Sequence, residues 1–255
     1  MPYREYQPHL LLRNFVACYW SSQNQTAQPH TVFPDACSDI LFNFGDPMII
    51  AANGVESRSE GLAFVIGTMT RSIHADGFGK QDLFGIRFKP GGISGVIREP
   101  QSAFTDNSIE INDCTHQMPN DLPDQLRAVA NEERVEMIDR WLLEKLSGFP
   151  GKSSWWWAVN RIISGHGNIR IKDLALESAM SEKQLERKFL AHVGVTPKQL
   201  GTIARFCEAK RQLEQRHESL EGLAWDLGYT DHAHFTKSFR AFAGFAPSEF
   251  MKSLN

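Results

Sequence analysis

One sequence pattern occurs twice in the last third of this 255-residue chain, about fifty residues apart. The first copy, LALESAMSEKQLERKFLAHVGVTP, covers residues 174–197, and the second, LAWDLGYTDHAHFTKSFRAFAGFAP, covers residues 223–247. The copies match at an offset of 49 up to the turn and of 50 beyond it, so one residue is inserted after the turn of the second copy. Each copy has the layout of a helix-turn-helix unit, whose second helix can enter the major groove of DNA. Two units on one chain can reach two successive major-groove faces, which lie about 34 Å apart on B-DNA.

The residues around each turn suit this layout. The turns 179–181 and 228–230 begin with a small residue and end with a hydroxyl residue, Ser181 or Thr230, which predicts an N-cap. Gln184 follows Ser181 by three residues and predicts a capping box. Apolar residues at helical spacing predict the buried face of each second helix: Leu185 and Phe189 in the first copy, and Phe235, Phe239 and Phe242 in the second. Two ordinary helical hairpins would be the alternative, but the number of positions matched in register favours the repeated unit.

Residues from about 155 to 255 resemble the DNA-binding domain of the AraC/XylS family of bacterial transcription regulators. The resemblance rests on IKDLALESAMSEKQLERKFLAHVGVTPKQL, RFCEAKRQL and LAWDLGYTDHAHFTKSFRAFAGFAPSEF. The last stretch has the family's most diagnostic pattern, a Gly-aromatic-Thr turn followed by His-Phe, Lys-x-Phe-Arg, Gly and Pro-Ser. The resemblance implies an all-α domain with two helix-turn-helix units joined by one long helix, which we expect at about 197–215.

The helix faces opposite the buried stripes are predicted to contact DNA. The resemblance implies groove-facing positions at these same residues, and an arginine can read guanine while a carboxylate can accept from cytosine. A solvated surface side chain is the alternative for each, most of all for His232. We expect Arg240 to hold a phosphate. The predicted DNA-binding residues are Lys183, Glu186, Arg187, His232, Ala233, Thr236, Lys237 and Arg240.

The charge distribution agrees with a DNA-binding module attached to a separate domain. Residues 152–255 contain 15 Lys and Arg against 11 Asp and Glu, a balance of +4. Residues 1–151 contain 12 and 19, a balance of −7. A basic module joined to an acidic one is typical of a DNA-binding regulator with a regulatory domain.

The remainder of the chain predicts a second domain rich in strands. Between residues 15 and 112 short β-rich runs alternate with turn residues, at 30–34, 39–45, 47–52, 62–67 and 82–92, which indicates a barrel or sandwich. Residues 121–146 have helical apolar spacing, and SGFPGKSS at 147–154 is the best linker. We therefore expect domains at 1–150 and 151–255. The segments FVACYW, FPDACSDILFNFGDP, IGTMTRSIHADG and GIRFKPGG resemble a sensor-like domain of some AraC-type regulators, which implies an α+β, cupin-like barrel followed by helices.

Candidate ligand-binding residues in this domain are Trp20, His30, Phe42 and Arg87, although aromatic residues on strands are more often core and Arg87 could form a structural salt bridge. His30, Asp35, Cys37 and Asp39 are of the types that bind zinc, but such residues are more often turn formers and core thiols. The cupin motif of two histidines one residue apart, a carboxylate and a later histidine is absent from this domain. We predict no metal, no cofactor and no enzymatic activity.

The sequence therefore predicts a two-domain transcription regulator that binds double-stranded DNA and responds to a small molecule or another signal at its N-terminal domain. A constitutive DNA-binding protein whose N-terminal domain only forms a homodimer is the main alternative; a metal- or redox-sensing regulator and a cupin-type enzyme are less favoured. RNA polymerase is an expected partner if the protein is an activator. The chain shows no secretion signal, and no run of about eighteen apolar residues that would indicate a membrane span. We expect a cytoplasmic location.

Overall fold

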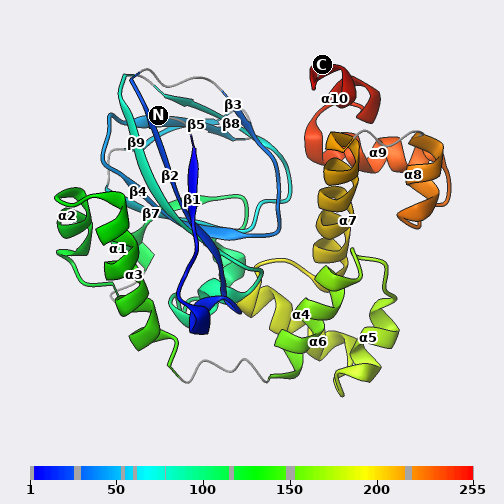
Figure 1. Cartoon of the computed structure of the whole chain (residues 1–255). Coiled ribbons are helices and arrows are strands. Elements are labelled where there is room, and N and C mark those ends of the chain that lie inside the picture. The colour runs from blue at the N-terminus through cyan, green and yellow to red at the C-terminus, as the bar shows by residue number, and fades with distance from the viewer. Residues whose placement is uncertain are drawn as a thin grey trace.

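The computed structural model describes residues 3–25, 30–52, 55–59, 62–77, 79–114, 118–147, 153–215 and 220–254. A part built from strands, followed by short helices, precedes a part built only from helices (Figure 1). This order confirms the predicted fold class. Residues 148–152 of the predicted linker lie outside the described residues, so the domain boundary at 150 stays a prediction.

Ten described strands form two sheets in the N-terminal part. The larger sheet has the order β1-β2-β9-β4-β7-β10 and the smaller one β3-β8-β5-β6, and every described strand pair is antiparallel. All five predicted runs are strands. The bounds are β1 Arg4–Tyr6, β2 Val16–Asn24, β3 His30–Val32, β4 Ser38–Asn43, β5 Met48–Ala52, β6 Val55–Ser59, β7 Ala63–Ile66, β8 Ile73–Gly77, β9 Gln81–Phe88 and β10 Ser108–Glu110. Among these strands the hydrogen bonds close neither sheet, so the expected barrel is an open pair of sheets.

The larger sheet has two different faces because side chains alternate along a strand. On one face lie Tyr19 of β2, Phe42 of β4 and Phe84 of β9, each fully buried. The other face carries Trp20 and Arg87, the neighbours of these positions, which are partly accessible. One face therefore forms a core, while the other has room for polar groups.

Helices cover the first of these faces. Residues 121–146, predicted to be helical, form two helices, α2 Leu122–Arg127 and α3 Asn131–Lys145, after the short α1 Ile111–Cys114. The apolar side of α3 is buried, and Asp139 accepts a 2.6 Å hydrogen bond from the Tyr19 hydroxyl on the sheet. Buried Arg134 lies with its Cζ 4.4 Å from the centre of the Phe44 ring. The apolar face that could have served a dimer is thus largely occupied within the chain. Three 3-10 helices, η1 Leu10–Leu12, η2 Gly92–Gly95 and η3 Gln101–Ala103, complete this part.

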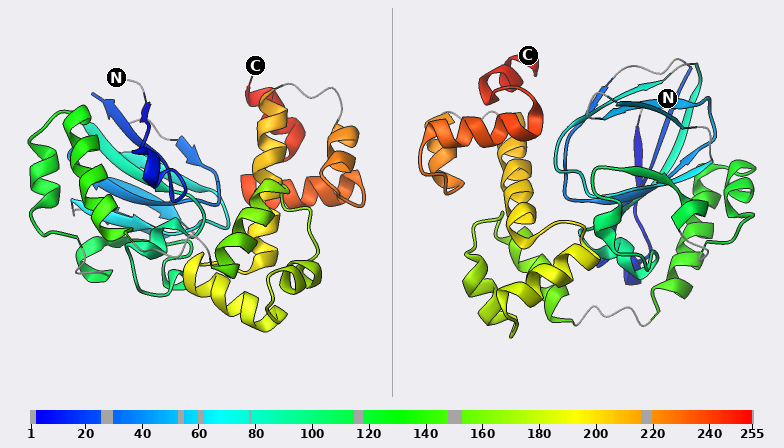
Figure 2. Two further views of the ribbon diagram at one scale, coloured as in Figure 1. Left: turned by 60° about the horizontal axis from the view of Figure 1, so that its bottom comes forward. Right: turned by 180° about the vertical axis from the view of Figure 1, so that it is seen from behind.

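Seven helices are described in the C-terminal part, and they contain the two predicted helix-turn-helix units (Figures 1 and 2). The long helix α7 joins the units and agrees with the predicted connecting helix. None of the helices in the described part of the chain is long and apolar enough to cross a membrane. The bounds are α4 Ser154–Ser164, α5 Ile171–Glu177, α6 Glu182–His192, α7 Pro197–Glu214, α8 Leu220–Asp226, α9 His232–Ala243 and α10 Pro247–Ser253.

The turn chemistry is confirmed in the first unit and corrected in the second. Ser181 and Gln184 form the predicted capping box, with hydrogen bonds of 3.2 and 2.9 Å. In the second unit the N-cap is Asp231, whose Oδ1 accepts from the His234 amide at 2.7 Å, and Thr230 lies outside the helix. The inserted residue separates the hydroxyl from the helix end, so the prediction of Thr230 as N-cap was wrong.

The predicted buried stripes lie in the helical core, with one position less enclosed than expected. Leu185, Phe189, Phe235 and Phe239 are almost completely buried, whereas Phe242 is partly buried. At the first position of each turn, Ala179 and Gly228 have φ values of 55° and 72°, in the left-handed region that favours glycine because it has no Cβ. This geometry explains the glycine at the start of the second turn, whereas Ala179 adopts the same conformation with a Cβ.

Replacing either buried ring should destabilise the helical part. We expect Phe189→Ala and Phe239→Ala each to lower the free energy of unfolding by roughly 3–5 kcal/mol, because each leaves a cavity in a packed core. Urea unfolding of the full chain followed by circular dichroism measures this. Leu176→Ala is a matched control, because Leu176 is 81% exposed and its loss should change stability by less than about 0.5 kcal/mol. Equal stability of the Phe189 variant and wild type would contradict the described packing.

Candidate nucleic-acid interface and interdomain cavity

The predicted DNA-binding residues of α6 lie on its exposed face. Lys183, Glu186 and Arg187 are all exposed, whereas Leu185 and Phe189 face the core. A helix places residues three and four positions apart on the same side, so Lys183, Glu186 and Arg187 form one patch in the N-terminal half of α6. That half is the part of a recognition helix that approaches base edges.

The equivalent residues of α9 are exposed, with one exception. His232, Ala233, Lys237 and Arg240 are exposed, and Lys237 occupies the position of Arg187 at the offset of 50. Thr236 is only partly exposed, and its Oγ1 is buried with no hydrogen-bond partner in the described residues. Its hydroxyl is therefore less available than predicted. Arg240 lies 4.0 Å from Glu249 in an exposed ion pair, and a DNA phosphate could take the place of Glu249 as the partner of Arg240.

The two recognition helices are held apart by contacts along α7. Arg205 of α7 donates a 3.1 Å hydrogen bond to the carbonyl of Gly167, ahead of the first unit, and its Cζ lies 5.2 Å from the ring centre of Tyr229, in the turn of the second. Further along α7, hydrogen bonds from Arg211 and Gln212 lower the pKa of buried Glu208 to about 2. The two Arg205 contacts tie the segment before the first unit and the turn of the second unit to the same helix, whereas the Glu208 hydrogen bonds lie within α7.

A loop of the N-terminal part touches both recognition helices. The Thr68 hydroxyl donates a 2.8 Å hydrogen bond to the carbonyl of Val193, directly after α6. Four residues later, the amide of Ser72 donates a 3.0 Å hydrogen bond to the carbonyl of Phe242 in α9. The loop itself is anchored by Asp106, which accepts from the amide and hydroxyl of Thr70 at 2.7 Å each. Residues 67–72, named here the bridging loop, therefore connect β7 of one sheet with β8 of the other and contact the C-terminal ends of α6 and α9.

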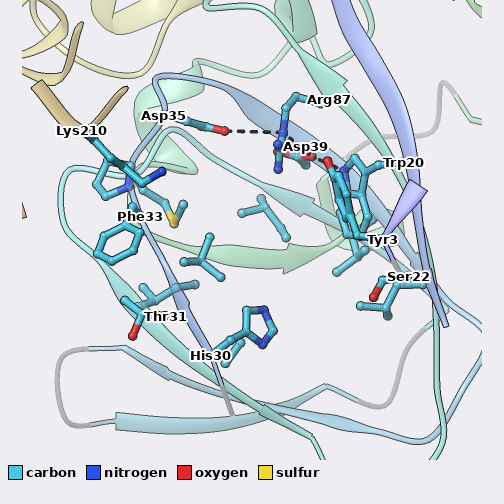
Figure 3. A pocket seen from close by; sticks show the side chains of 18 of the residues that line it. Tyr3, Trp20, Ser22, His30, Thr31, Phe33, Asp35, Asp39, Arg87 and Lys210 are labelled. Atoms are coloured by element: carbon cyan, nitrogen blue, oxygen red, sulfur yellow. Dashed lines mark hydrogen bonds and ion pairs between the residues drawn. The ribbon is translucent and has the colours of Figure 1, made fainter. Parts of the chain in front are cut away.

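A cavity of about 750 Å³ lies between the two sheets and α7 (Figure 3). Its size falls within the range of small-molecule sites in proteins. The second face of the larger sheet forms one wall, β3 and β8 form another, and residues of α7 form a third. Ile66, Met69 and Ile73, in and beside the bridging loop, also line it. The α7 residues are Cys207, Lys210, Arg211 and Glu214.

Three of the four predicted ligand-binding residues line this cavity. Trp20, His30 and Arg87 do so, whereas Phe42 lies on the opposite face of β4, where it is fully buried and its ring stacks on Phe44 at 6.2 Å. The alternation of β4 explains the difference, because Leu41 takes the cavity side. Sequence reasoning missed the α7 residues, since no local pattern indicates that this helix would lie against the sheets.

An ionic cluster occupies one end of the cavity. The Arg87 Nε lies 3.5 Å from Asp35 Oδ2 and 3.4 Å from Asp39 Oδ1, and Trp20 donates to Asp39 at 2.8 Å (Figure 3). Burial raises the pKa of Asp39 to about 6, and Asp35 adds to this while Arg87 and Trp20 oppose it. Both carboxylates raise the pKa of Arg87, against the effect of its burial. The guanidinium of Arg87, a predicted ligand-binding residue, is thus already shared by two carboxylates.

The residues considered for a metal are arranged differently from a metal site. Asp35 and Asp39 face Arg87, and the Cys37 amide donates to Asp35 Oδ1 at 2.9 Å. Burial raises the pKa of the Cys37 thiol well above its usual value, with Asp35 adding to the shift, and this disfavours the thiolate that binds metals. Among the described residues, no group of three or more His, Cys, Asp and Glu side chains could hold a metal ion.

Comparison with known proteins gives a family for each part. A family described as a helix-turn-helix domain matches residues 174–253, and one described as a domain of unknown function (DUF6597) matches residues 4–110. An uncharacterised HTH-type transcriptional regulator of Haemophilus influenzae is 33% identical over 85 residues, which are 33% of this chain and 28% of that protein. The raffinose operon transcriptional regulatory protein RafR of Pediococcus pentosaceus is 32% identical over 84 residues, 33% of this chain and 30% of RafR. The matched regions thus span less than a third of these two relatives.

Solved structures extend the likeness to both parts of the chain. A structure of ToxT from Vibrio cholerae has a TM-score of 0.52 at 13% identity and covers 92% of this chain and 98% of that one. A second ToxT structure, from strain O395, has a TM-score of 0.50 at 12% identity and covers 92% and 96%. At such low identity the likeness concerns the fold, which has the same order of a sheet-rich part and a helical part. Residues 174–253 thus form an AraC-type helix-turn-helix domain, the relatives matched over this region are transcription regulators, and the two parts of the chain share the fold of ToxT.

Proposed function

We propose that this protein is a DNA-binding transcription regulator whose two helix-turn-helix units are controlled by a small molecule bound in the interdomain cavity. The observation that carries the DNA-binding part is the pair of exposed, equivalent patches on α6 and α9, with Arg187 and Lys237 at matching positions. A single long helix joins both units, which suits recognition of two successive major-groove faces.

The cavity and the bridging loop support the regulatory part. Residues that line the cavity flank the loop, and the loop donates hydrogen bonds to the ends of both recognition helices. A ligand changes DNA affinity only if it binds the DNA-competent and DNA-incompetent arrangements unequally, and such coupling is typically 1–3 kcal/mol. An occupant that moves Met69 or Ile73 would act directly on the loop and so on the spacing of the two helices.

The relatives are named as transcription regulators, and this supports a regulator without enzymatic activity, as does the absence of the cupin histidine motif from the N-terminal sequence. The alternative of a domain that only dimerises receives less support, because the apolar side of α3 is buried within the chain. Homodimer formation and a contact with RNA polymerase belong to the same proposal and are tested by light scattering and by transcription in vitro. The proposed place of action is the cytoplasm, where bacterial DNA is accessible.

Arg187 should contribute to sequence-specific affinity. We expect Arg187→Ala to weaken binding of the full chain to its DNA site by roughly 1–3 kcal/mol and to relax the base preference at one position, because a base-reading pair is lost. Selection of bound sequences from a random DNA library, followed by fluorescence anisotropy, measures both effects.

Lys188→Ala is the matched control for Arg187→Ala, since it removes one positive charge from the same helix on a different side. Lys188 lies near His192, whose pKa is lowered by burial and then by Lys188, and the His192 ring stacks on Trp155 at 4.2 Å. A loss of specificity in the Lys188 variant but not in the Arg187 variant would show that the groove-facing side of α6 has been misidentified.

Arg240 is expected to contact a phosphate and carry no sequence information. Arg240→Ala should weaken binding to all DNA sequences about equally and reduce the slope of log affinity against log salt by about 1. Titrations at several salt concentrations measure the slope, with Lys252→Ala as a control on the exposed C-terminal helix. An unchanged slope together with altered base preference would assign Arg240 to base reading instead.

The bridging loop should transmit the state of the cavity. With a compound that stabilises the full chain in a thermal-shift screen, Thr68→Val should reduce the factor by which the compound changes DNA affinity, because the hydrogen bond to Val193 is lost. Thr105→Val is the matched control: its hydroxyl donates to the carbonyl of the adjacent Gly194 at 2.6 Å, but Thr105 lies outside the bridging loop. Equal losses of coupling in both variants would indicate a general loosening of the interface and would argue against the loop.

A further inference from the structure

The two ends of the cavity differ in charge and in aromatic content. The end formed by β1, β2, β4 and β9 holds Asp35, Asp39 and Arg87 beside the rings of Tyr3 and Trp20 (Figure 3). We propose that this end, named here the acidic-aromatic end, selects an organic cation: a protonated amine carried on an apolar body. The proposal rests on the proposed function in taking the cavity to be the effector site, and it adds the chemical class of the effector.

The cations that line the cavity are already paired within the described residues. Arg87 is shared between two carboxylates, at 3.5 and 3.4 Å. On α7, Lys210 Nζ lies 2.6 Å from Glu214 Oε1, and Arg211 pairs with Glu208. An anionic ligand would have to displace one of these carboxylates, and it would meet the remaining negative charge as a repulsion.

The acidic-aromatic end, in contrast, has more negative than positive charge. Two carboxylates, Asp35 and Asp39, face the single guanidinium of Arg87, and a third, Glu5, accepts a 2.7 Å hydrogen bond from the Tyr3 hydroxyl. Asp39 is only 8% exposed, so its charge is poorly screened by water. A cation bound here would compensate a charge that the protein itself leaves in excess.

The aromatic rings beside these carboxylates provide the second part of an amine site. Tyr3 and Trp20 are stacked, with ring centres 5.9 Å apart and planes at 27°. Trp20 lies over Gly85, where a Cβ atom would overlap the indole ring, so the backbone itself makes room for the indole. The Cζ of Arg87 lies 6.0 Å from the Trp20 ring centre, a cation–π contact within the chain. Aromatic faces next to a carboxylate attract ammonium groups through cation–π and ionic contacts.

Proton linkage distinguishes a cation from an anion at this site. Burial raises the pKa of Asp39 to about 6, and the groups around it are Arg87 on β9, Trp20 and Cys18 on β2, and Asp35 and Cys37 in the segment before β4. A bound cation favours the ionised carboxylate and lowers this pKa, so binding near pH 6 releases protons. A bound anion would raise the pKa and cause proton uptake.

Three probes of one shape and different charge test the proposal on the full chain: 4-phenylbutylamine, 4-phenylbutan-1-ol and 4-phenylbutyrate. Isothermal titration calorimetry at pH 6, in two buffers of different ionisation enthalpy, gives the affinity and the number of protons exchanged. We expect the amine to bind about tenfold or more tightly than the alcohol, the butyrate to bind weakest, and the amine to release protons. Tightest binding by the butyrate, or proton uptake with the amine, would overturn the proposal.

Two substitutions test whether Asp39 and Asp35 cause the preference for the amine over the alcohol. Asp39→Asn keeps an acceptor for the Trp20 indole but removes the charge, and it should bring the affinity for the amine down to that for the alcohol. Asp35→Asn, at a more accessible position, serves as a second variant if the first fails to fold, and should reduce the preference at least severalfold. Glu214→Gln, which removes a carboxylate that lines the cavity from α7 and pairs with Lys210, is the matched control and should retain the preference for the amine. Full amine selectivity in both aspartate variants would reject the acidic-aromatic end as its source.

The same measurements separate this proposal from the proposed function. Equal binding of all three probes rejects the cation class and leaves the cavity as an effector site. Binding of none of them, with DNA affinity intact in fluorescence anisotropy, rejects the cavity as the amine site and leaves the DNA-binding proposal standing. If the wild-type chain binds no DNA but still binds the amine selectively, the proposed function is rejected and the amine site stands.

Discussion

The burial of α7 on several sides is the constraint on which the rest of the structure depends. Leu200 and Ile203, near its start, belong to a hydrophobic core that continues into the first helix-turn-helix unit and the N-terminal sheets. Phe206 and Leu213, further along, belong to the core of the second unit. Because one rigid helix is part of both cores, neither recognition helix can move independently of it. A displacement of α7 would therefore carry both recognition helices with it.

The interdomain cavity exists because the side chains of α7 and of the two sheets do not fill the space between them. The larger sheet uses one face for its core under α3 and presents Trp20, Asp39 and Arg87 on the other, where apolar packing against the smaller sheet is incomplete. Phe33 continues the contact with the second unit, since its ring lies 6.0–6.4 Å from those of Phe206, Phe245 and Phe250. A ligand in this position is in contact with the sheets and with α7 at once. Recognition of a signal and control of DNA binding can therefore share one interface without a long pathway between them.

Sequence reasoning succeeded where a residue's role depends on its immediate neighbours and failed where it depends on distant ones. The capping box of Ser181 needs only a partner three residues away, and it is present. The N-cap of α9 was placed one residue too early, because a hydroxyl and a carboxylate at 230 and 231 are both good caps and the choice follows from where the chain enters the helix. Phe42 was expected in a ligand site, but the register of β4 turns it to the core side. Residues 121–146 have the predicted helical structure, as two helices, since apolar helical spacing is also a local signal.

The sequence by itself determined the two helix-turn-helix units, the helix between them, five of the strands and the order of a sheet-rich part before a helical one. It could do so because turn chemistry and apolar periodicity act over a few residues and are repeated within the chain. The tertiary structure alone decided that α7 closes a cavity, that Arg87 is shared by Asp35 and Asp39, and that the bridging loop reaches both recognition helices. These contacts join residues far apart in the chain; Ser72 and Phe242, for example, are 170 positions apart. They follow from how the two cores pack together, which no local pattern in the chain encodes.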